Sequence, residues 1–119
     1  MIQTIDLNDE RVLGYRIDGD ISLADMTPLL AQLKAKVAHQ PTHLRAYAEY
    51  VRIGSISPKA FWEDLKADAT YLSAFEKAAV VTDKEWVGWL ANLGNLFPNL
   101  TIKVFPFSQR EQAIDWISQ

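Results

Sequence analysis

The apolar residues of this chain alternate between two periods, and this alternation limits its fold more than any other feature. Apolar residues at every second position, or in short runs, are typical of strands, whereas apolar residues three and four apart are typical of helices. Two strand patterns, over 2–7 and 12–19, come first, and the polar residues 8–11 join them. This order predicts an antiparallel hairpin at the start of the chain.

Helical and strand patterns alternate after the hairpin. A helix is predicted to begin after the N-cap residue Ser22 and to end before Pro41, because Pro41 cannot continue it. Its apolar face consists of Leu23, Met26, Leu29, Leu30, Leu33 and Val37. Strands are predicted over 44–51, 78–81 and 100–105, the second as an apolar run covered on both faces.

Further helices are predicted between and after these strands. One covers 57–66, opening with an N-cap serine and a proline, and another covers 82–97. A short helical turn is predicted over 71–76. Ser108 and Glu111 have the spacing of a capping box, which predicts the start of a C-terminal helix.

These elements predict one α/β domain over residues 1–119, a length typical of single domains. The five strands would form a mostly parallel sheet with an N-terminal antiparallel hairpin and helices on both faces. Parallel neighbours need crossover connections, which are nearly always right-handed. A hydrophobic fraction of 49% and a charged fraction of 23% are typical of a globular chain.

Composition also excludes several classes of function. The chain has no cysteine, so disulfides, thiolate catalysis and cysteine-ligated metals are excluded. Its net charge is −3 and its pI is near 5.3, the opposite of the balance expected for a general nucleic-acid binder. We therefore expect a cytoplasmic protein without a nucleic-acid partner.

The motifs of common enzyme sites are absent from the sequence. His39 and His43 are separated by Pro41 and have no third clustered ligand, so no metal site is predicted. Ser55 lacks the second glycine of a nucleophile elbow, and no histidine follows it. Neither glycine-rich nucleotide loop occurs. The sequence thus predicts no enzyme, no catalytic residue and no cofactor.

Aromatic residues are concentrated in the second half of the chain, where all four Trp and all five Phe follow residue 60. Such residues either pack as core or line an apolar pocket. In the second case, residues 58–76 would form a movable cover over the helix that begins at Thr82. The predicted ligand-binding residues are Phe61, Trp62, Leu65, Tyr71, Phe75, Trp86, Trp89, Leu90 and Leu93.

Four short segments, taken in order, resemble the SpoIIAA-like bacterial family. They are the segment from Phe61 to Leu65, the segment from Phe75 to Trp86, Val104-Phe105 and the segment from Ala113 to Ile117. In that family a W-x-D-L segment, an AVV-x-D-x-x-W segment, a V-x-x-F strand and an A-x-x-W-[LI] helix recur in this order. The resemblance implies a fold related to STAS domains and CRAL-TRIO lipid carriers, wound as a right-handed βα superhelix.

The resemblance implies two kinds of function. Kinship with CRAL-TRIO carriers implies a non-enzymatic domain that binds a small apolar or lipid-like ligand, with peripheral contact at the inner membrane. Kinship with STAS domains implies instead a regulatory module with a protein partner, controlled by phosphorylation of Ser55 or Ser57. The Asp-Ser pair of STAS antagonists is missing from the segment that holds these serines. A homodimer is compatible with either function.

Overall fold

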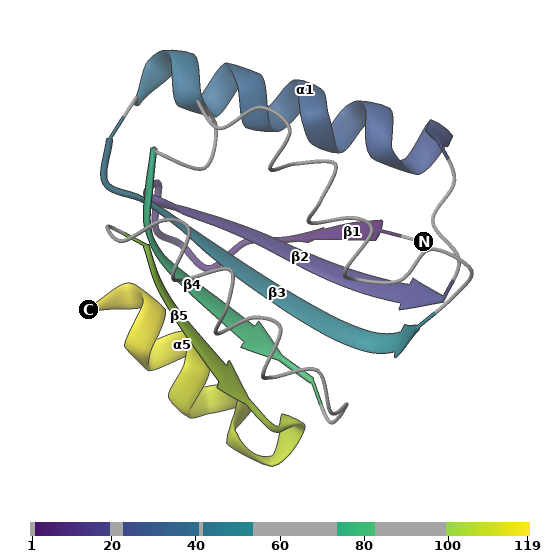
Figure 1. The fold of residues 1–119 in the computed structure, drawn as a ribbon, viewed down its shortest axis with the longest axis vertical. Coiled ribbons are helices and arrows are strands. Elements are labelled where there is room, and N and C mark those ends of the chain that lie inside the picture. Colours follow the sequence, from purple (N-terminus) through teal and green to yellow (C-terminus); the bar gives the residue numbers. More distant parts are fainter. Residues whose placement is uncertain (1, 20–22, 41, 54–73, 83–99) are drawn as a thin grey trace.

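A computed structural model describes residues 2–19, 23–40, 42–53, 74–82 and 100–119 (Figure 1). Its strands form one sheet in the spatial order β1-β2-β3-β4-β5. A 3₁₀ turn, η1, precedes the last helix. The elements are β1 Ile2–Ile5, β2 Val12–Gly19, α1 Leu23–His39, β3 Leu44–Ile53, β4 Phe75–Val81, β5 Thr101–Phe105, η1 Phe107–Gln109 and α5 Arg110–Ser118.

The sheet has the predicted mixed topology. β1 pairs with β2 in antiparallel orientation, and the pairs β2–β3, β3–β4 and β4–β5 are all parallel. β3 is therefore the central strand, with two neighbours on each side. Helices lie on both faces, because α1 crosses one face and α5 packs on the opposite one (Figure 1). The α/β fold class predicted from the sequence is confirmed.

One hydrophobic core fills the space beneath α1. Leu29 and Leu33 are buried, and Val37 is partly buried against the same cluster, which confirms the predicted apolar face at these three positions. The strand residues of this core come from alternate positions, because side chains of a strand point to opposite faces in turn, except between Phe75 and Ala78, where the β3–β4 register shifts. They are Ile17, Leu44, Ala48, Tyr50, Phe75, Ala78 and Val80.

A second core lies beneath α5 on the opposite face. Ala113 and Ile117 of α5 are fully buried there. They pack with the other alternate set of strand residues, Val12, Tyr47, Ala79, Val81 and Phe105. β4 contributes to both cores, so its residues 78–81 are buried on both faces, as the apolar run predicts.

The first strand is shorter than predicted, ending at Ile5 rather than Leu7. The Asp6 carboxylate accepts a hydrogen bond from the Asn8 N–H at 2.8 Å, which forms an Asx turn. Asn8 has a φ of 58°, in the left-handed region. These residues turn the chain toward β2, so the hydrogen-bonded pairing of β1 with β2 ends at Ile5.

The strands β3 and β4 are longer than predicted. β3 continues through Ile53, where a loop was expected from Arg52 onward. β4 begins at Phe75, so the predicted helical turn over 71–76 is wrong at Phe75 and Glu76. Phe75 pairs with Leu44 of β3 and is buried in the core under α1. Pairing with Leu44 explains why Phe75 is extended, and Glu76 continues the strand at the register shift before the Arg45–Lys77 pair.

The capping box predicted for the last helix does not form. Ser108 lies inside η1, and the N-cap residue of α5 is Gln109, which makes no side-chain cap hydrogen bond. The N–H of Gln109 donates to the Pro106 carbonyl at 2.9 Å. The chain therefore enters α5 through a tighter turn, which places Ser108 one residue before the cap.

The helix predicted over 57–66 lies outside the described residues, and so does the one predicted over 82–97 except for its first residue, Thr82. Within the described residues, no helix is both long and apolar enough to cross a membrane.

Candidate functional site

An ionic cluster centred on Glu49 lies on the α5 face of the sheet. Glu49 belongs to β3 and is only 1% exposed. Its neighbours in register are Arg16 of β2 and Val81, the last residue of β4. Glu49 is thus level with the carboxyl end of β4, and ligands of open α/β sheets bind beyond the carboxyl ends of the strands.

Three side chains converge on the Glu49 carboxylate. Oε1 accepts hydrogen bonds from Nε and Nη2 of Arg16, at 3.3 and 3.2 Å. Oε2 accepts a hydrogen bond from the Tyr47 hydroxyl at 2.7 Å and another from Nε of Arg110 at 2.8 Å. The carboxylate is therefore hydrogen-bonded through both oxygens, as a buried charge requires.

The electrostatics of this cluster favour fixed charges over proton transfer. Burial tends to raise the pKa of Glu49, but the bonds from Tyr47 and Arg110 and the charge of Arg16 lower it overall. Burial and the bond to Glu49 raise the pKa of the Tyr47 hydroxyl. At neutral pH the carboxylate is ionised and the phenol is neutral, so neither group is near its titration point.

The two arginines also reach solvent. The side chains of Arg16 and Arg110 are 41% and 37% exposed, and together they carry more N–H donors than two carboxylate oxygens can accept. Two guanidinium charges against one carboxylate give the side chains of Arg16, Arg110 and Glu49 together a net charge of +1. The arrangement suits an anionic group approaching from solvent, because arginine pairs well with carboxylate and phosphate.

A β-bulge lies beside the cluster, near the end of β3. Ile17 pairs with Tyr50 and Asp18 pairs with Arg52, so Val51 is the extra residue of the bulge. Val51 is 41% exposed. Bulges redirect side chains next to functional sites, and this one places an exposed valine two residues after Glu49 along β3.

A second polar cluster holds the other end of α5. Arg45 shares a face of β3 with Tyr47 and Glu49 and is 6% exposed. Its Nη1 donates to the main-chain oxygen of Ile117 at 2.7 Å and also to that of Gln119. A cation at the C-terminal end of a helix is favourable, because the last carbonyls lack intrahelical partners.

Glu76 of β4 completes this second cluster. Its Oε1 accepts a hydrogen bond from Nε of Arg45 at 2.9 Å, and its Oε2 lies 3.2 Å from Nδ1 of His43. These contacts lower the pKa of Glu76, that with His43 contributing most. His39, the other histidine considered for a metal site, is the last residue of α1. Within the described ranges, no three potential metal ligands of the His, Cys, Asp or Glu types come together.

The structure describes few of the site residues that the sequence predicts. Of the nine predicted ligand-binding residues, Phe75 alone is described, and it is buried as a strand residue of the core rather than part of a helical cover. The other eight lie outside the described residues, and so do the phosphorylation candidates Ser55 and Ser57.

Sequence reasoning missed the Glu49 cluster, although a signal for it was present. The strand pattern over 44–51 places Arg45, Tyr47 and Glu49 on one face. A central strand of a parallel sheet has both faces covered. Charged residues at alternate positions of such a strand must therefore be buried and paired with opposite charges. The neighbouring strands and the last helix are the elements that can supply these partners.

The fold and the comparisons with known proteins agree. A five-stranded mixed sheet with helices on both faces is the arrangement of STAS-type α/β domains. The family model described as SpoIIAA-like matches residues 12–118, nearly all of the sequence. The chain belongs to the SpoIIAA-like family. No curated protein and no solved structure matches it.

Proposed function

We propose that this chain is a non-enzymatic regulatory module that binds an acidic segment of a protein partner at the Glu49 cluster, level with the carboxyl end of β4. The observation that carries the proposal is the convergence of Arg16 and Arg110 on the buried Glu49. Glu49 fixes the two guanidinium groups, so they lose little side-chain entropy when a partner carboxylate pairs with them. Val51, which is exposed and follows Glu49 by two positions on β3, would supply an apolar contact to the same segment.

Phosphorylation of Ser55 or Ser57 is proposed as the control of this binding. Both serines follow β3 closely in sequence, since the strand ends at Ile53. A phosphate adds a charge of about −1.5 to −2 and three strong acceptor oxygens. It would compete with the partner for the arginines and repel acidic residues, so the modified protein should bind more weakly.

The test compares variants in a pull-down from cells that express the natural protein. Arg110→Gln and Arg16→Gln should release proteins that the wild type and the control Lys34→Gln retain. Lys34 is an exposed residue of α1, on the opposite face of the sheet. Retention should also fall as salt is raised, because exposed ion pairs are screened. Identical retention by the Arg110 and Lys34 variants would contradict the proposed site.

Control by phosphorylation is tested separately, with aspartate and alanine variants of the two serines and with peptide mapping. Ser55→Asp and Ser57→Asp should bind the same partners less than the corresponding alanine variants, and peptide mapping of protein from cells should find a phosphate on one of these serines. Equal binding by the aspartate and alanine variants, with no phosphopeptide, would remove the switch and leave the arginine site intact.

Native mass spectrometry of the purified protein distinguishes this function from binding of an apolar or lipid-like ligand. If the chain is the proposed regulatory module, the mass measured for the native protein should equal that of the chain without a bound ligand. Stoichiometric carryover of a fatty acid or phospholipid would instead favour the apolar site formed by the predicted aromatic residues, together with contact at a membrane surface.

A further inference from the structure

A cluster of two lysines and two aromatic rings lies on the α5 face of the sheet, over β4 and β5. Its members are Lys77 of β4, Lys103 and Phe105 of β5, and Trp116 of α5, and we call it the lysine–aromatic cluster. β5 is the last strand in the spatial order, and α5 runs alongside it (Figure 1). Lys103 is exposed, and Lys77 and Trp116 are partly buried, so the cluster is accessible from solvent.

The strand register explains why the two lysines meet. Lys103 is in register with Ala79, which is buried beneath α5, and Lys77 lies two residues before Ala79 on β4. Residues two apart on a strand share a face, so both lysines project toward α5. There the ammonium nitrogens of Lys77 and Lys103 lie 5.0 and 5.5 Å from the centroid of the Trp116 ring. One indole ring thus holds two positive charges.

The aromatic rings keep these charges in place. The rings of Phe105 and Trp116 are tilted against each other with their centroids 6.2 Å apart. Phe105 is buried, and Trp116 packs against the same core. The Lys103 ammonium nitrogen also lies 5.7 Å from the Phe105 centroid. Because the face of an aromatic ring attracts a cation, both lysine side chains are partly ordered before a ligand arrives and lose less entropy when they bind it.

The two ammonium groups have rings rather than carboxylates as their partners. Within the part of the chain that the structure describes, no carboxylate forms an ion pair with Lys77 or Lys103. Like charges beside one ring repel each other, and each ammonium carries three N–H donors. An anionic group in contact with both lysines would offset the repulsion and accept hydrogen bonds from them, so the cluster favours an anion.

The type of basic residue favours one class of anion. Two ammonium charges are matched best by a dianion, and a phosphate monoester carries a charge of about −1.5 to −2 at neutral pH. Lysine binds phosphate as a point charge, whereas the planar fork of arginine also fits a carboxylate through two parallel bonds. A single carboxylate would leave one of the two positive charges without compensation. The lysine–aromatic cluster therefore fits a phosphate monoester.

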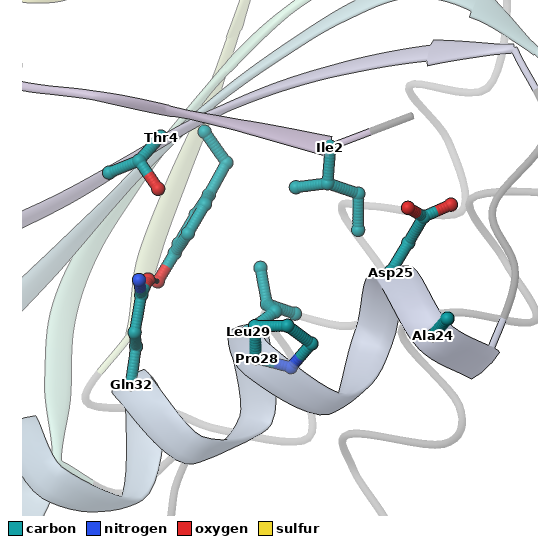
Figure 2. A pocket seen from close by; sticks show the side chains of 8 residues that line it. Ile2, Thr4, Ala24, Asp25, Pro28, Leu29 and Gln32 are labelled. Atoms are coloured by element: carbon teal, nitrogen blue, oxygen red, sulfur yellow. Dashed lines mark hydrogen bonds between the residues drawn. The ribbon is translucent and has the colours of Figure 1, made fainter.

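The groove on the opposite face of the sheet offers an anion no comparable site. It lies between the first half of α1 and the strands β1 and β2 and has a volume of about 130 Å³ (Figure 2). None of the described residues that line it is basic, and Asp25 is among them. An anion is therefore expected on the α5 face rather than in this groove.

We propose that the lysine–aromatic cluster binds a phosphate monoester group, whose oxygens accept hydrogen bonds from the ammonium groups of Lys77 and Lys103. This site is additional to the acidic-segment site at Arg16 and Arg110, and it does not depend on the function proposed for those arginines. The phosphate belongs either to a free small molecule or to the phosphoserine side chain of a peptide.

The test is an NMR titration of the ¹⁵N-labelled protein with methyl phosphate, at constant ionic strength and about pH 8, where the monoester is a dianion. Shifts should appear at the start of β4, in β5 and in the second half of α5, with a dissociation constant in the millimolar range. Dimethyl phosphate, a monoanion of similar shape, should bind at least about tenfold more weakly. Nα-acetyl-O-phosphoserine methylamide distinguishes the sources: tighter binding than methyl phosphate indicates a peptide, and weaker binding indicates a small molecule.

Two variants and two controls test the assignment to the lysines. Lys77→Gln and Lys103→Gln should each weaken binding of methyl phosphate about threefold to tenfold, because each removes one charge-assisted bond. Lys34→Gln, on the α1 face, should change nothing. Arg110→Gln should also leave these shifts unchanged, which separates this site from the one at Glu49. Equal binding of the two phosphates, unchanged binding by both lysine variants, or a loss confined to Arg110→Gln would overturn the proposal.

Discussion

The guanidinium of Arg45 donates a hydrogen bond to the main-chain oxygen of Ile117 across 2.7 Å, so a buried residue of the central strand caps the last helix. The two residues are 72 positions apart in sequence, so only the completed fold brings them together. Glu49, on the same strand face, pairs with Arg110 at the other end of α5. β3 thus holds α5 at both ends.

Replacing Arg45 by methionine should detach the end of α5. The change leaves Glu76 and the last helix carbonyls without their buried donor, at a cost of about 3–5 kcal/mol in the free energy of unfolding. Arg45→Lys should recover part of it, because lysine keeps the charge but lacks the planar fork. Urea unfolding measures the loss, and hydrogen exchange should accelerate in α5. The exposed Lys34→Met serves as the control, and similar losses for both variants would contradict the capping role.

Glu49→Gln should remove a pH-dependent part of the stability. The folded protein lowers the pKa of Glu49 below its unfolded value of about 4.3, so its charge stabilises the fold above that pH. This contribution is lost as the pH falls through the folded pKa. At pH 7 we expect a loss of about 1–3 kcal/mol, since the half-exposed arginines can turn to solvent. The difference should shrink below about pH 4.

Urea unfolding of the wild type and the Glu49→Gln variant at pH 3.5 and pH 7 measures this difference. Glu111→Gln, an exposed change in the first turn of α5, is the matched control and should show no comparable loss. A difference for Glu49→Gln that stays constant over this range would show that its charge does not stabilise the fold.

Gly14→Ala should destabilise the protein, although alanine usually costs a strand nothing. A Cβ at this position would lie 2.5 Å from the carbonyl oxygen of Ile5 on the paired strand, so β1 and β2 would have to move apart. Overpacking of this kind costs about 1–3 kcal/mol in the free energy of unfolding. Gln3→Ala, an exposed change on β1, should have little effect. A Gly14→Ala protein as stable as the wild type would show that β1 can move away from β2 at no cost in the free energy of unfolding.

The Asp9 carboxyl should titrate near the bottom of the accessible pH range. Hydrogen bonds from the Arg11 side chain and the Arg11 main-chain N–H lower its pKa to about 2. In Arg11→Ala the side-chain bonds are lost, and the pKa should rise toward its ordinary value of about 3.9. Carbon-detected NMR titration measures both values. Lys34→Ala should leave the Asp9 pKa at about 2, and an unchanged value in Arg11→Ala would exclude this ion pair as the cause.

Local patterns determined which segments of the described chain are strands and which are helices. The apolar spacing of α1 places Leu29 and Leu33 on one face, and both are buried. The apolar run of 78–81 predicts a strand covered on both faces, and its residues are buried. These features follow from periodicities within a few residues, because one turn of helix or one strand repeat spans so short a stretch.

Tertiary structure decided the features that depend on residues far apart in sequence. Phe75 is extended because it pairs with Leu44, although its local sequence favoured a helical turn. Glu49 became the centre of a cluster only when β2 and α5 brought Arg16 and Arg110 to it, from 33 and 61 positions away. A local pattern shows that a strand residue is charged. Which partners neutralise a buried charge is decided by the elements that the completed fold packs around it.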